Sequence, residues 1–251
     1  MFSHFVAEAF ILSFTVSVKS DSIDVKSTTN NIGGNSPKKQ IDHISGTLEF
    51  SKILFSCAEQ DSFSLIALDT LYPPVNWNGS DKKIVCASHT HSAPMLDASK
   101  PRLGEVDMGF LSKVEQFIGS VQFQTESKIN SVECYQIFAD HSVYRRADLS
   151  HTKSGQALNF FRRKIKSAWP NPAINIDKSV YLINLISSQK SVCASFIYYA
   201  NHPVITAGKH EISSDFVGTL RNAVRELFNP SAILFFQGCS GDIRPNFLKR
   251  T

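Results

Sequence analysis

The feature that most constrains the fold is a set of three short apolar runs, each ending in small and polar residues. The runs are Ile84–Ala87, Ser191–Tyr199 and Ala232–Phe236, and they lead into the sequences SHTHSAP, ANHPV and QGCSGD. Apolar runs of this length bounded by turn-forming residues are typical of buried strands. We therefore expect three strands whose ends carry polar residues. The ends of the two later strands are expected to form one site together with the end of the first.

The remaining pattern mixes strand and helix signals. A polar turn separates the apolar runs 48–57 and 63–68, and residues 129–139 alternate as a strand does. Residues 179–186 and 191–199 predict a hairpin. Helical spacing occurs over 108–123 and over 216–228, where Ser213-Ser214-Asp215 predicts the helix start and Asn229-Pro230 its end. We predict an α/β fold with mixed β-sheets flanked by helices, in a single domain over residues 47–251.

The first 46 residues form a separate segment in this interpretation. Residues 20–46 are rich in Ser, Asn, Asp, Lys and Gly, which predicts a long polar loop. Residues 5–18 are apolar, but Glu8 interrupts them and no Lys or Arg precedes them. A signal peptide begins with a basic region, so a strand or packed segment is favoured here.

Composition excludes several functional classes. The chain has 251 residues, 42% hydrophobic and 19% charged, with a net charge of +4, as in an ordinary globular domain. Its basic residues are not interleaved with aromatic ones, so no nucleic-acid partner is expected. Five cysteines without CxxC spacing argue against a disulfide framework and a thiolate zinc site. Two arginine pairs, at 145–146 and 162–163, either hold surface carboxylates or line a pocket.

Three histidines are candidate metal ligands. His89 and His91 point the same way if they continue the strand pattern, because alternate residues share a face. His202 also follows an apolar run. Two or three imidazoles with an oxygen ligand are the usual donors of a catalytic zinc site. The other candidates for completing such a site are Glu105, Asp107 and Asp215, whereas His43, His141, His151 and His210 lie in polar sequence and are expected to be solvated.

The turn at residues 237–242 is a candidate for substrate contacts. Gly238 and Gly241 permit a close approach of backbone N–H groups to a substrate, as in an oxyanion pocket. Cys239 and Ser240 are candidate nucleophiles, although the turn lacks the G-x-S-x-G pattern.

Four stretches in this order resemble the neutral/alkaline non-lysosomal ceramidase family. The resemblance covers roughly residues 48–247. The matching sequences are SHTHSAP at 88–94, NHPV at 201–204, SDFVG at 214–218 and FQGCSGDIRPN at 236–246. The first is the most specific of the four.

This resemblance implies a zinc-dependent amidase that cleaves N-acylsphingosine into a sphingoid base and a fatty acid. His89 and His202 match the family's first two zinc ligands, and His91 matches a histidine beside the substrate and the attacking water. Gly238 stands where the ceramidases have a serine, and Gly238, Ser240 and His91 are the predicted catalytic positions. The implied partner is a ceramide-like lipid at a membrane surface, and the implied location is secreted or membrane-associated.

Two features favour alternatives to a complete ceramidase. Gly238 in place of serine favours a related hydrolase of another amide or ester. The family's remaining ligands, a glutamate and a tyrosine, lie downstream of the fourth stretch, so the chain is expected to be the N-terminal part of the catalytic domain. A truncated, non-catalytic domain is therefore the third hypothesis.

Overall fold

Nine strands form the main sheet of the computed structural model, which describes residues 3–7, 14–23, 43–44, 47–57, 62–75, 82–146, 171–207 and 209–247. The strand order is β12-β10-β9-β7-β2-β4-β5-β6, with β1 beside β7. The β5–β6 and β10–β12 pairs are parallel and the other pairs are antiparallel. The strands are β1 (Ser3–Ala7), β2 (Phe14–Ile23), β4 (Leu48–Cys57), β5 (Ser62–Leu68), β6 (Lys83–Ala87), β7 (Thr125–Phe138), β9 (Ser179–Ser187), β10 (Val192–Tyr199) and β12 (Ala232–Gln237).

Two short strand pairs and the helices complete the described part. The pairs are parallel β3 (His43–Ile44) with β11 (Glu211–Ile212) and antiparallel β8 (Ser142–Tyr144) with β13 (Ile243–Pro245). The helices are α1 (Met108–Gly119), α4 (Phe216–Phe228) and the 3-10 turn η2 (Pro101–Leu103). No helix in the described ranges combines the length and apolar character that a membrane crossing requires.

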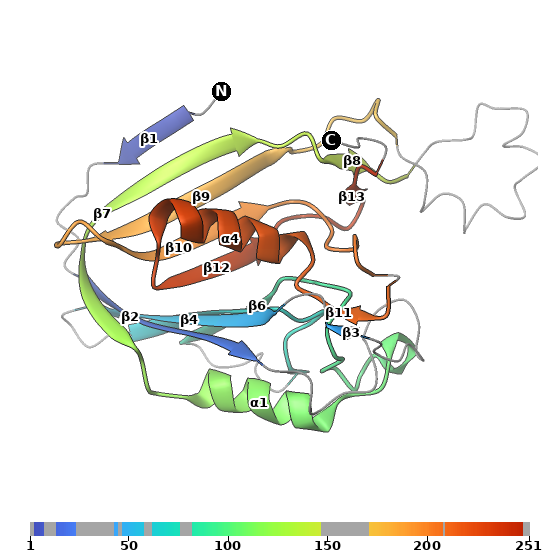
Figure 1. Cartoon of the computed structure of the whole chain (residues 1–251), viewed down its shortest axis with the longest axis horizontal. Coiled ribbons are helices and arrows are strands. Elements are labelled where there is room, and N and C mark those ends of the chain that lie inside the picture. Colours follow the sequence, from blue (N-terminus) through green and yellow to red (C-terminus); the bar gives the residue numbers. More distant parts are fainter. Residues whose placement is uncertain are drawn as a thin grey trace, which may run out of the picture.

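The sheet folds back on itself at β7, the long bent strand in Figure 1. Its first residues, 125–128, pair with β2, whereas 129–138 pair with β9. This bend brings β12 against β2, β4, β5 and β6. The core between the two halves includes Val18 of β2, Ile53 of β4 and Leu234 of β12, all fully or almost fully buried. Burial of apolar surface between the halves is thus what closes the fold.

Each helix covers the outer face of one half. Phe110, Val114 and Phe117 of α1 pack on Phe50 and Leu68 of the lower half in Figure 1. On the other half, Val217 and Val224 of α4 pack on a cluster that includes Ile197 and Phe235 of β10 and β12. The predicted α/β class with a mixed sheet flanked by helices is confirmed.

Most predicted elements are confirmed, with shifted ends. The 48–57/63–68 pair and the hairpin are antiparallel neighbours, and Asp215 caps α4 through a 2.8 Å bond from the Phe216 N–H. Helix α1 ends at Gly119, short of the predicted 123, because Ser120 adopts an extended conformation.

The N-terminal segment differs more from its prediction. Residues 5–7 and 14–18 are strand, but the polar loop predicted from Ser20 is wrong at its start, because β2 continues to Ile23. Strand β2 lies between β4 and β7, pairing with β4 along its whole length and with β7 over residues 15–18, so part of the 1–46 segment belongs inside the sheet. Cross-strand pairing sustains the polar residues 19–22 as strand, which local propensity alone does not predict. The domain boundary at 46 otherwise stays a prediction.

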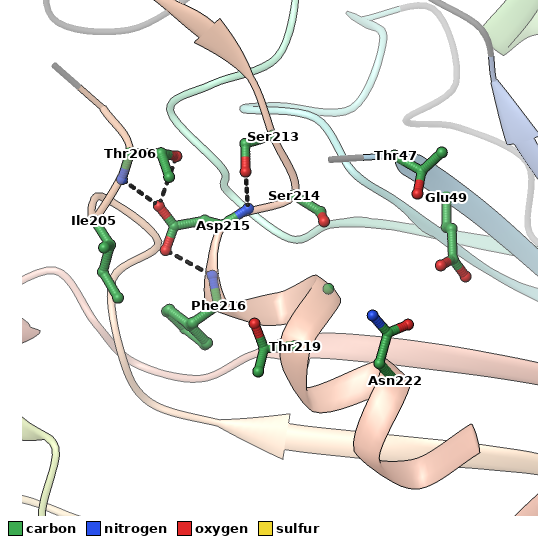
Figure 2. Close-up of a pocket in the computed structure, with 11 residues that line it drawn as sticks. Thr47, Glu49, Ile205, Thr206, Ser213, Ser214, Asp215, Phe216, Thr219 and Asn222 are labelled. Atoms are coloured by element: carbon green, nitrogen blue, oxygen red, sulfur yellow. Dashed lines mark hydrogen bonds between the residues drawn. The ribbon is translucent and has the colours of Figure 1, made fainter. Parts of the chain in front are cut away.

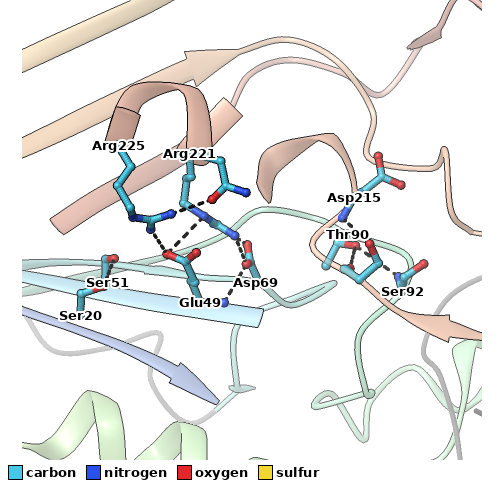
Figure 3. A network of polar contacts seen from close by, with 11 residues as sticks. Ser20, Glu49, Ser51, Asp69, Thr90, Ser92, Asp215, Arg221 and Arg225 are labelled. Atoms are coloured by element: carbon cyan, nitrogen blue, oxygen red, sulfur yellow. Dashed lines mark hydrogen bonds and ion pairs between the residues drawn. The ribbon is translucent and has the colours of Figure 1, made fainter. Parts of the chain in front are cut away.

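A buried ion pair joins α4 to the lower half of the sheet (Figure 3). Arg221 donates from both terminal nitrogens to the carboxylate of Asp69, and both side chains are almost fully buried. Asp69 also accepts the N–H of Glu49 at 2.9 Å, and Glu49 lies 3.6 Å from Arg221 Nε and 2.8 Å from Arg225. Asp69 therefore anchors a helix through a charge pair, rather than capping a turn at the end of its strand.

Candidate metal centre

Three strand ends from opposite halves of the sheet meet at one place. The loop after β6 carries His89 and His91, the loop after β10 carries His202, and the turn after β12 carries Ser240. The N–H of His91 donates to the carbonyl of Pro203 at 3.2 Å, which joins the first two loops directly. The side chain of Gln237 donates to the carbonyl of Asn201 at 2.9 Å, which joins the third.

His89, His91 and His202 form one cluster. Their ring centroids are separated by 5.1, 4.9 and 5.1 Å, and one ligand atom from each ring lies within 4.8 Å of the others. His202 is buried and the other two are half-buried. The sequence prediction that these residues come together is borne out by this geometry, and the group could hold a metal ion.

The reason for the convergence differs from the predicted one. Strand β6 ends at Ala87, so His89 and His91 do not continue its alternation. Instead His89 has φ of 66°, in the left-handed region that non-glycine residues seldom occupy. The N–H of His89 donates to the Thr70 carbonyl at 3.0 Å, and the neighbouring Thr90 hydroxyl donates to the Ser213 carbonyl at 2.8 Å. These contacts hold the backbone in a conformation that turns both rings toward His202.

Backbone carbonyls orient two of the rings. Nδ1 of His89 lies 2.9 Å from the Leu71 carbonyl oxygen, and Nδ1 of His202 lies 3.0 Å from that of Ser240. A carbonyl only accepts, so each Nδ1 carries the proton and each Nε2 keeps its lone pair for a metal. Tyr72 packs edge-on against the His89 ring, with centroids 5.4 Å apart.

The spacing of donor atoms suits zinc. Nε2 of His91 and Nε2 of His202 are 3.0 Å apart. Two nitrogens bound to one tetrahedral zinc at about 2.0–2.1 Å would lie about 3.3 Å from each other. The cluster is thus compact enough for one zinc ion held by two of its three imidazoles, and the imidazole donor set fits zinc.

The electrostatics favour the neutral form of His89 and His202. Burial lowers the pKa of His89, and the positive charge of Arg145 adds to this effect, while the bond to Leu71 opposes it. Burial likewise lowers the pKa of His202, with smaller contributions in the same direction from His89 and Arg145. The Ser240 carbonyl and, less strongly, the negative charge of Asp215 oppose the shift. Neutral imidazole is the form that binds a metal, so both shifts favour coordination.

The predicted catalytic turn has a structural role that the sequence did not suggest. The Gly238 N–H donates to the Tyr199 carbonyl at 3.0 Å, so it is already occupied. A Cβ at Gly238 would lie 2.8 Å from the Tyr198 hydroxyl and 2.9 Å from the Ala200 Cα, which explains why no larger residue stands there. Ser240 is buried and contributes its carbonyl to His202. Catalytic roles for Gly238 and Ser240 stay predictions.

The candidate oxygen ligands do not join the cluster. Asp107 accepts the Phe110 N–H at 2.7 Å as the cap of α1, and Glu105 is exposed. Asp215 accepts from the N–H and hydroxyl of Thr206 at 2.8 and 2.9 Å. Within the described residues, the only group with metal-ligand spacing is therefore the three histidines. Of the other histidines, His141 is exposed as predicted, and His151 lies outside the described residues.

A cavity of about 350 Å³ lies beside the cluster's supporting loops, at the N-terminus of α4 (Figure 2). Thr206, Ser213 and Asp215 line it, and the Thr206 hydroxyl is 2.8 Å from that of Ser92 in the histidine loop. The cavity thus borders the framework behind the histidines and not the metal-binding nitrogens themselves.

The sequence analysis left the role of Arg145 open, between holding a surface carboxylate and lining a pocket, and assigned no role to Arg244. Arg145 acts electrostatically on both His89 and His202, and Arg244 follows the glycine turn on β13. The signal available was the charged residue in the DIRP sequence after the turn. The second arginine pair, 162–163, lies outside the described residues.

Comparisons with known proteins support the fold. No protein-family model and no curated protein matches the sequence. Among solved structures, the neutral ceramidase from Pseudomonas aeruginosa matches with a TM-score of 0.68 and 16% identity, over 94% of this chain and 40% of that chain. A ceramidase complexed with C2 matches with a TM-score of 0.69 and 15% identity, over 94% and 39%. The chain has the ceramidase fold and spans about two fifths of these proteins' length, which confirms the resemblance at the level of the fold.

Proposed function

We propose that the protein is a zinc-dependent hydrolase of a linear amide. The observation that carries this proposal is the cluster of His89, His91 and His202, two of whose rings are oriented by backbone carbonyls with Nε2 facing the cluster. The ceramidase fold of the chain supports the same reaction class. The chain spans only part of the length of those proteins. The proposal therefore includes additional zinc ligands that lie outside the described residues.

In this proposal His89 and His202 hold the zinc ion, as the sequence resemblance implies. Zinc bound there supplies Lewis-acid polarisation of the amide carbonyl and activates water near neutral pH. Each ligand needs its other nitrogen fixed, and the carbonyls of Leu71 and Ser240 do this. The loss of either carbonyl contact would let the ring rotate and weaken metal binding.

His91 is the proposed acid–base group. Its Nε2 lies 3.0 Å from Nε2 of His202, so it stands next to the reacting centre rather than at the outer edge of the site. An imidazole in that place can take a proton from the attacking water and return it to the leaving nitrogen. In the overall reaction the C–N bond breaks, the acyl carbon gains the hydroxyl of water and the amine gains its proton.

N-acylsphingosine is the first candidate substrate, because the similar structures are those of ceramidases. A lipid substrate also implies contact with a membrane surface and a secreted or membrane-associated location. The second candidate is another amide or ester. It is favoured by Gly238, where a serine side chain would collide with Ala200, and by Arg244 beyond the turn.

The test measures zinc content and hydrolysis together. We expect the protein, or the longer protein of which it forms a part, to bind stoichiometric zinc and to hydrolyse an N-acyl amide. In the His89→Ala variant both should be lost, with zinc affinity falling by more than the 10- to 100-fold that removal of an outer hydrogen-bond partner typically costs. Exposed His141 offers a matched control, and His141→Ala should keep both properties.

Two results would contradict the proposal. Wild-type protein without bound zinc after dialysis against zinc-containing buffer would remove the metal site. Activity of His89→Ala equal to wild type would show that the cluster is not the reacting centre. Comparison of ceramide with a panel of other amides and esters then separates the two candidate substrates.

A further inference from the structure

Two arginines share one face of the β8–β13 ribbon, whose strands follow β7 and β12 of the main sheet in the chain (Figure 1). Arg244 lies opposite Val143 in the antiparallel register, and the N–H of Arg145 donates to the Asp242 carbonyl at 2.8 Å. Arg145 is therefore the diagonal neighbour of Arg244 on the same face. Diagonal neighbours in antiparallel pairs are within reach of each other's long side chains.

Both guanidinium groups lack an anionic partner among the described residues. Nε of Arg145 and Nε of Arg244 are buried without a hydrogen bond, and no ion pair within the described ranges includes either residue. The contact found for Arg244 is with the Phe247 ring, 5.6 Å away. Burial, with a smaller contribution from Arg145, lowers the pKa of Arg244. Two like charges held together under these conditions are unfavourable unless an anion joins them.

The acidic residue nearest in register does not neutralise them. Asp242 lies on the same face as Arg244, two residues before it, yet its carboxylate forms no ion pair with either arginine in the described part of the chain. By contrast, Arg221 in the core has the Asp69 carboxylate on both terminal nitrogens. Among the described residues, Arg145 and Arg244 therefore have no carboxylate partner of the kind that Arg221 has.

The ribbon and the histidines belong to one unit of backbone. The Ser240 carbonyl accepts from Nδ1 of His202 at 3.0 Å and also from the Ile243 N–H at 3.1 Å. Residues 240–243 thus orient His202 at one end and begin the strand that carries Arg244 at the other. The N–H of Arg145 donates to the Asp242 carbonyl, so the second arginine is attached to the same turn.

We propose that the substrate carries a carboxylate or phosphate group close to the bond that is cleaved, and that Arg145 and Arg244 bind this anion. This inference rests on the proposed function, since it names the substrate class of the same site. Arginine pairs bind planar carboxylates and phosphates through parallel N–H bonds, which also orients the substrate. A neutral ceramide would leave both guanidinium groups without a partner. The anionic N-acyl amide is the better fit to this site.

Equilibrium binding tests the inference without any hydrolysis. Calorimetry on the metal-free protein, at constant ionic strength, compares three probes with the same acyl chain. They are N-dodecanoylglycine with a carboxylate, O-phospho-N-dodecanoylethanolamine with a phosphate, and neutral N-dodecanoylethanolamine. We expect at least one anionic probe to bind about 10- to 100-fold more tightly than the neutral one, as hydrogen bonds to charged groups would produce. The tighter of the two anionic probes identifies which group the site accepts.

Substitution of Arg244 assigns the preference to the pair. Arg244→Met keeps the aliphatic stem and should remove most of the preference for the anion, with less than about a 3-fold change for the neutral probe. Arg244→Lys keeps the charge and should retain part of the preference, although it loses the fork geometry. Arg102 is exposed on η2, and Arg102→Met is the control for the general effect of one positive charge. Thermal unfolding of each variant confirms that it folds.

The outcomes separate the inference from the proposed function. Equal binding of all three probes, or an equal loss for charged and neutral probes in folded Arg244→Met, would overturn the inference. The same loss of preference in Arg102→Met would also overturn it, because the effect would then be a general charge effect. If the binding preference depends on Arg244 but the zinc-loaded protein cleaves none of the amides, the inference stands and the proposed function fails.

Discussion

Two polar clusters in this protein contrast in how their charges are matched. In the cluster of Glu49, Asp69, Arg221 and Arg225, every charge faces an opposite one, and Figure 3 shows Arg221 between the two carboxylates. At the metal centre, by contrast, three imidazoles lie together, and neither they nor Arg145 and Arg244 of the adjoining ribbon have a carboxylate bonded to them in the described ranges. The first cluster is complete within the chain. In the second cluster, the donor atoms are arranged so that they could hold a metal ion.

The two clusters show that polar groups are buried for two different reasons. A buried group with a partner stabilises a particular packing, here the attachment of α4 to the sheet. Buried groups of the same kind without partners reduce stability and are retained where they bind a ligand. Partner identity, rather than burial or charge alone, separates a structural cluster from a functional one.

The largest expected effect comes from breaking the complete cluster. Arg221→Met leaves the Asp69 carboxylate buried without its cation, which should lower the free energy of unfolding by about 3–5 kcal/mol. Urea unfolding measures the change. Arg225 has a side chain that is 42% exposed and bonds to Glu49, so Arg225→Met should cost less than about 1 kcal/mol. Equal effects of the two substitutions would contradict the distinction between the buried and the exposed pair.

A smaller effect tests whether the turn at the metal centre is a packing element. Gly238→Ser introduces a Cβ 2.9 Å from the Ala200 backbone and should lower the free energy of unfolding by about 1–3 kcal/mol. Gly241 lies three residues on in the same turn with no atom within 4 Å of its hypothetical Cβ, so Gly241→Ser should change stability by less than about 0.5 kcal/mol. Urea unfolding of both variants compares them. A neutral Gly238→Ser would show that the contact relaxes freely.

The last effect is spread over a range of pH and concerns a third kind of buried charge, one whose hydrogen bonds go to carbonyls. Lys52 donates to the carbonyls of Ile118 and Ser120 at the end of α1, and burial, with Lys83 and Lys19, lowers its pKa to about 8. The unfolded chain keeps the ordinary value of about 10.5, so it binds more protons than the folded chain between pH 8 and 10.5. The contribution of Lys52 to stability should therefore rise with pH across this window, by at most about 1.4 kcal/mol per pH unit.

Comparison of variants isolates this titration. Lys52→Met should flatten the rise of unfolding free energy between pH 8 and 10, while exposed Lys128→Met should leave the slope unchanged. Urea unfolding at a series of pH values gives the slopes. The same slope in wild type and Lys52→Met would mean that Lys52 keeps an ordinary pKa in the folded protein.

Local pattern predicted most of the fold. The apolar alternation of residues 179–186 and 191–199 with a polar turn between them specified an antiparallel hairpin, and the spacing within 216–228 specified an amphipathic helix. These signals are local because a strand or a helix buries one face at a regular period. The polar residues 19–22 of β2 carried no such signal. They are strand because β4 pairs with them along their whole length.

The site was predicted in part. His89, His91 and His202 were identified from their positions after apolar runs, and the structure brings all three together. The roles of the Leu71 and Ser240 carbonyls could not be predicted, because every residue has a carbonyl and only tertiary contact selects one. The role of Arg145 was left open, and Arg244 was missed, for a similar reason. The sequence around an arginine looks the same whether its side chain is solvated or is buried without an ion-pair partner.

The sequence by itself determined the type of fold and the chemistry available at the ends of three strands. Both follow from local order, since apolar periodicity sets the elements and residue type sets the donor atoms. Only the tertiary structure decided which donors meet. The bend of β7 folds one half of the sheet over the other and so carries the end of β6 to the ends of β10 and β12. His89 and His202, more than a hundred residues apart in the chain, become neighbours through burial of the core between those halves.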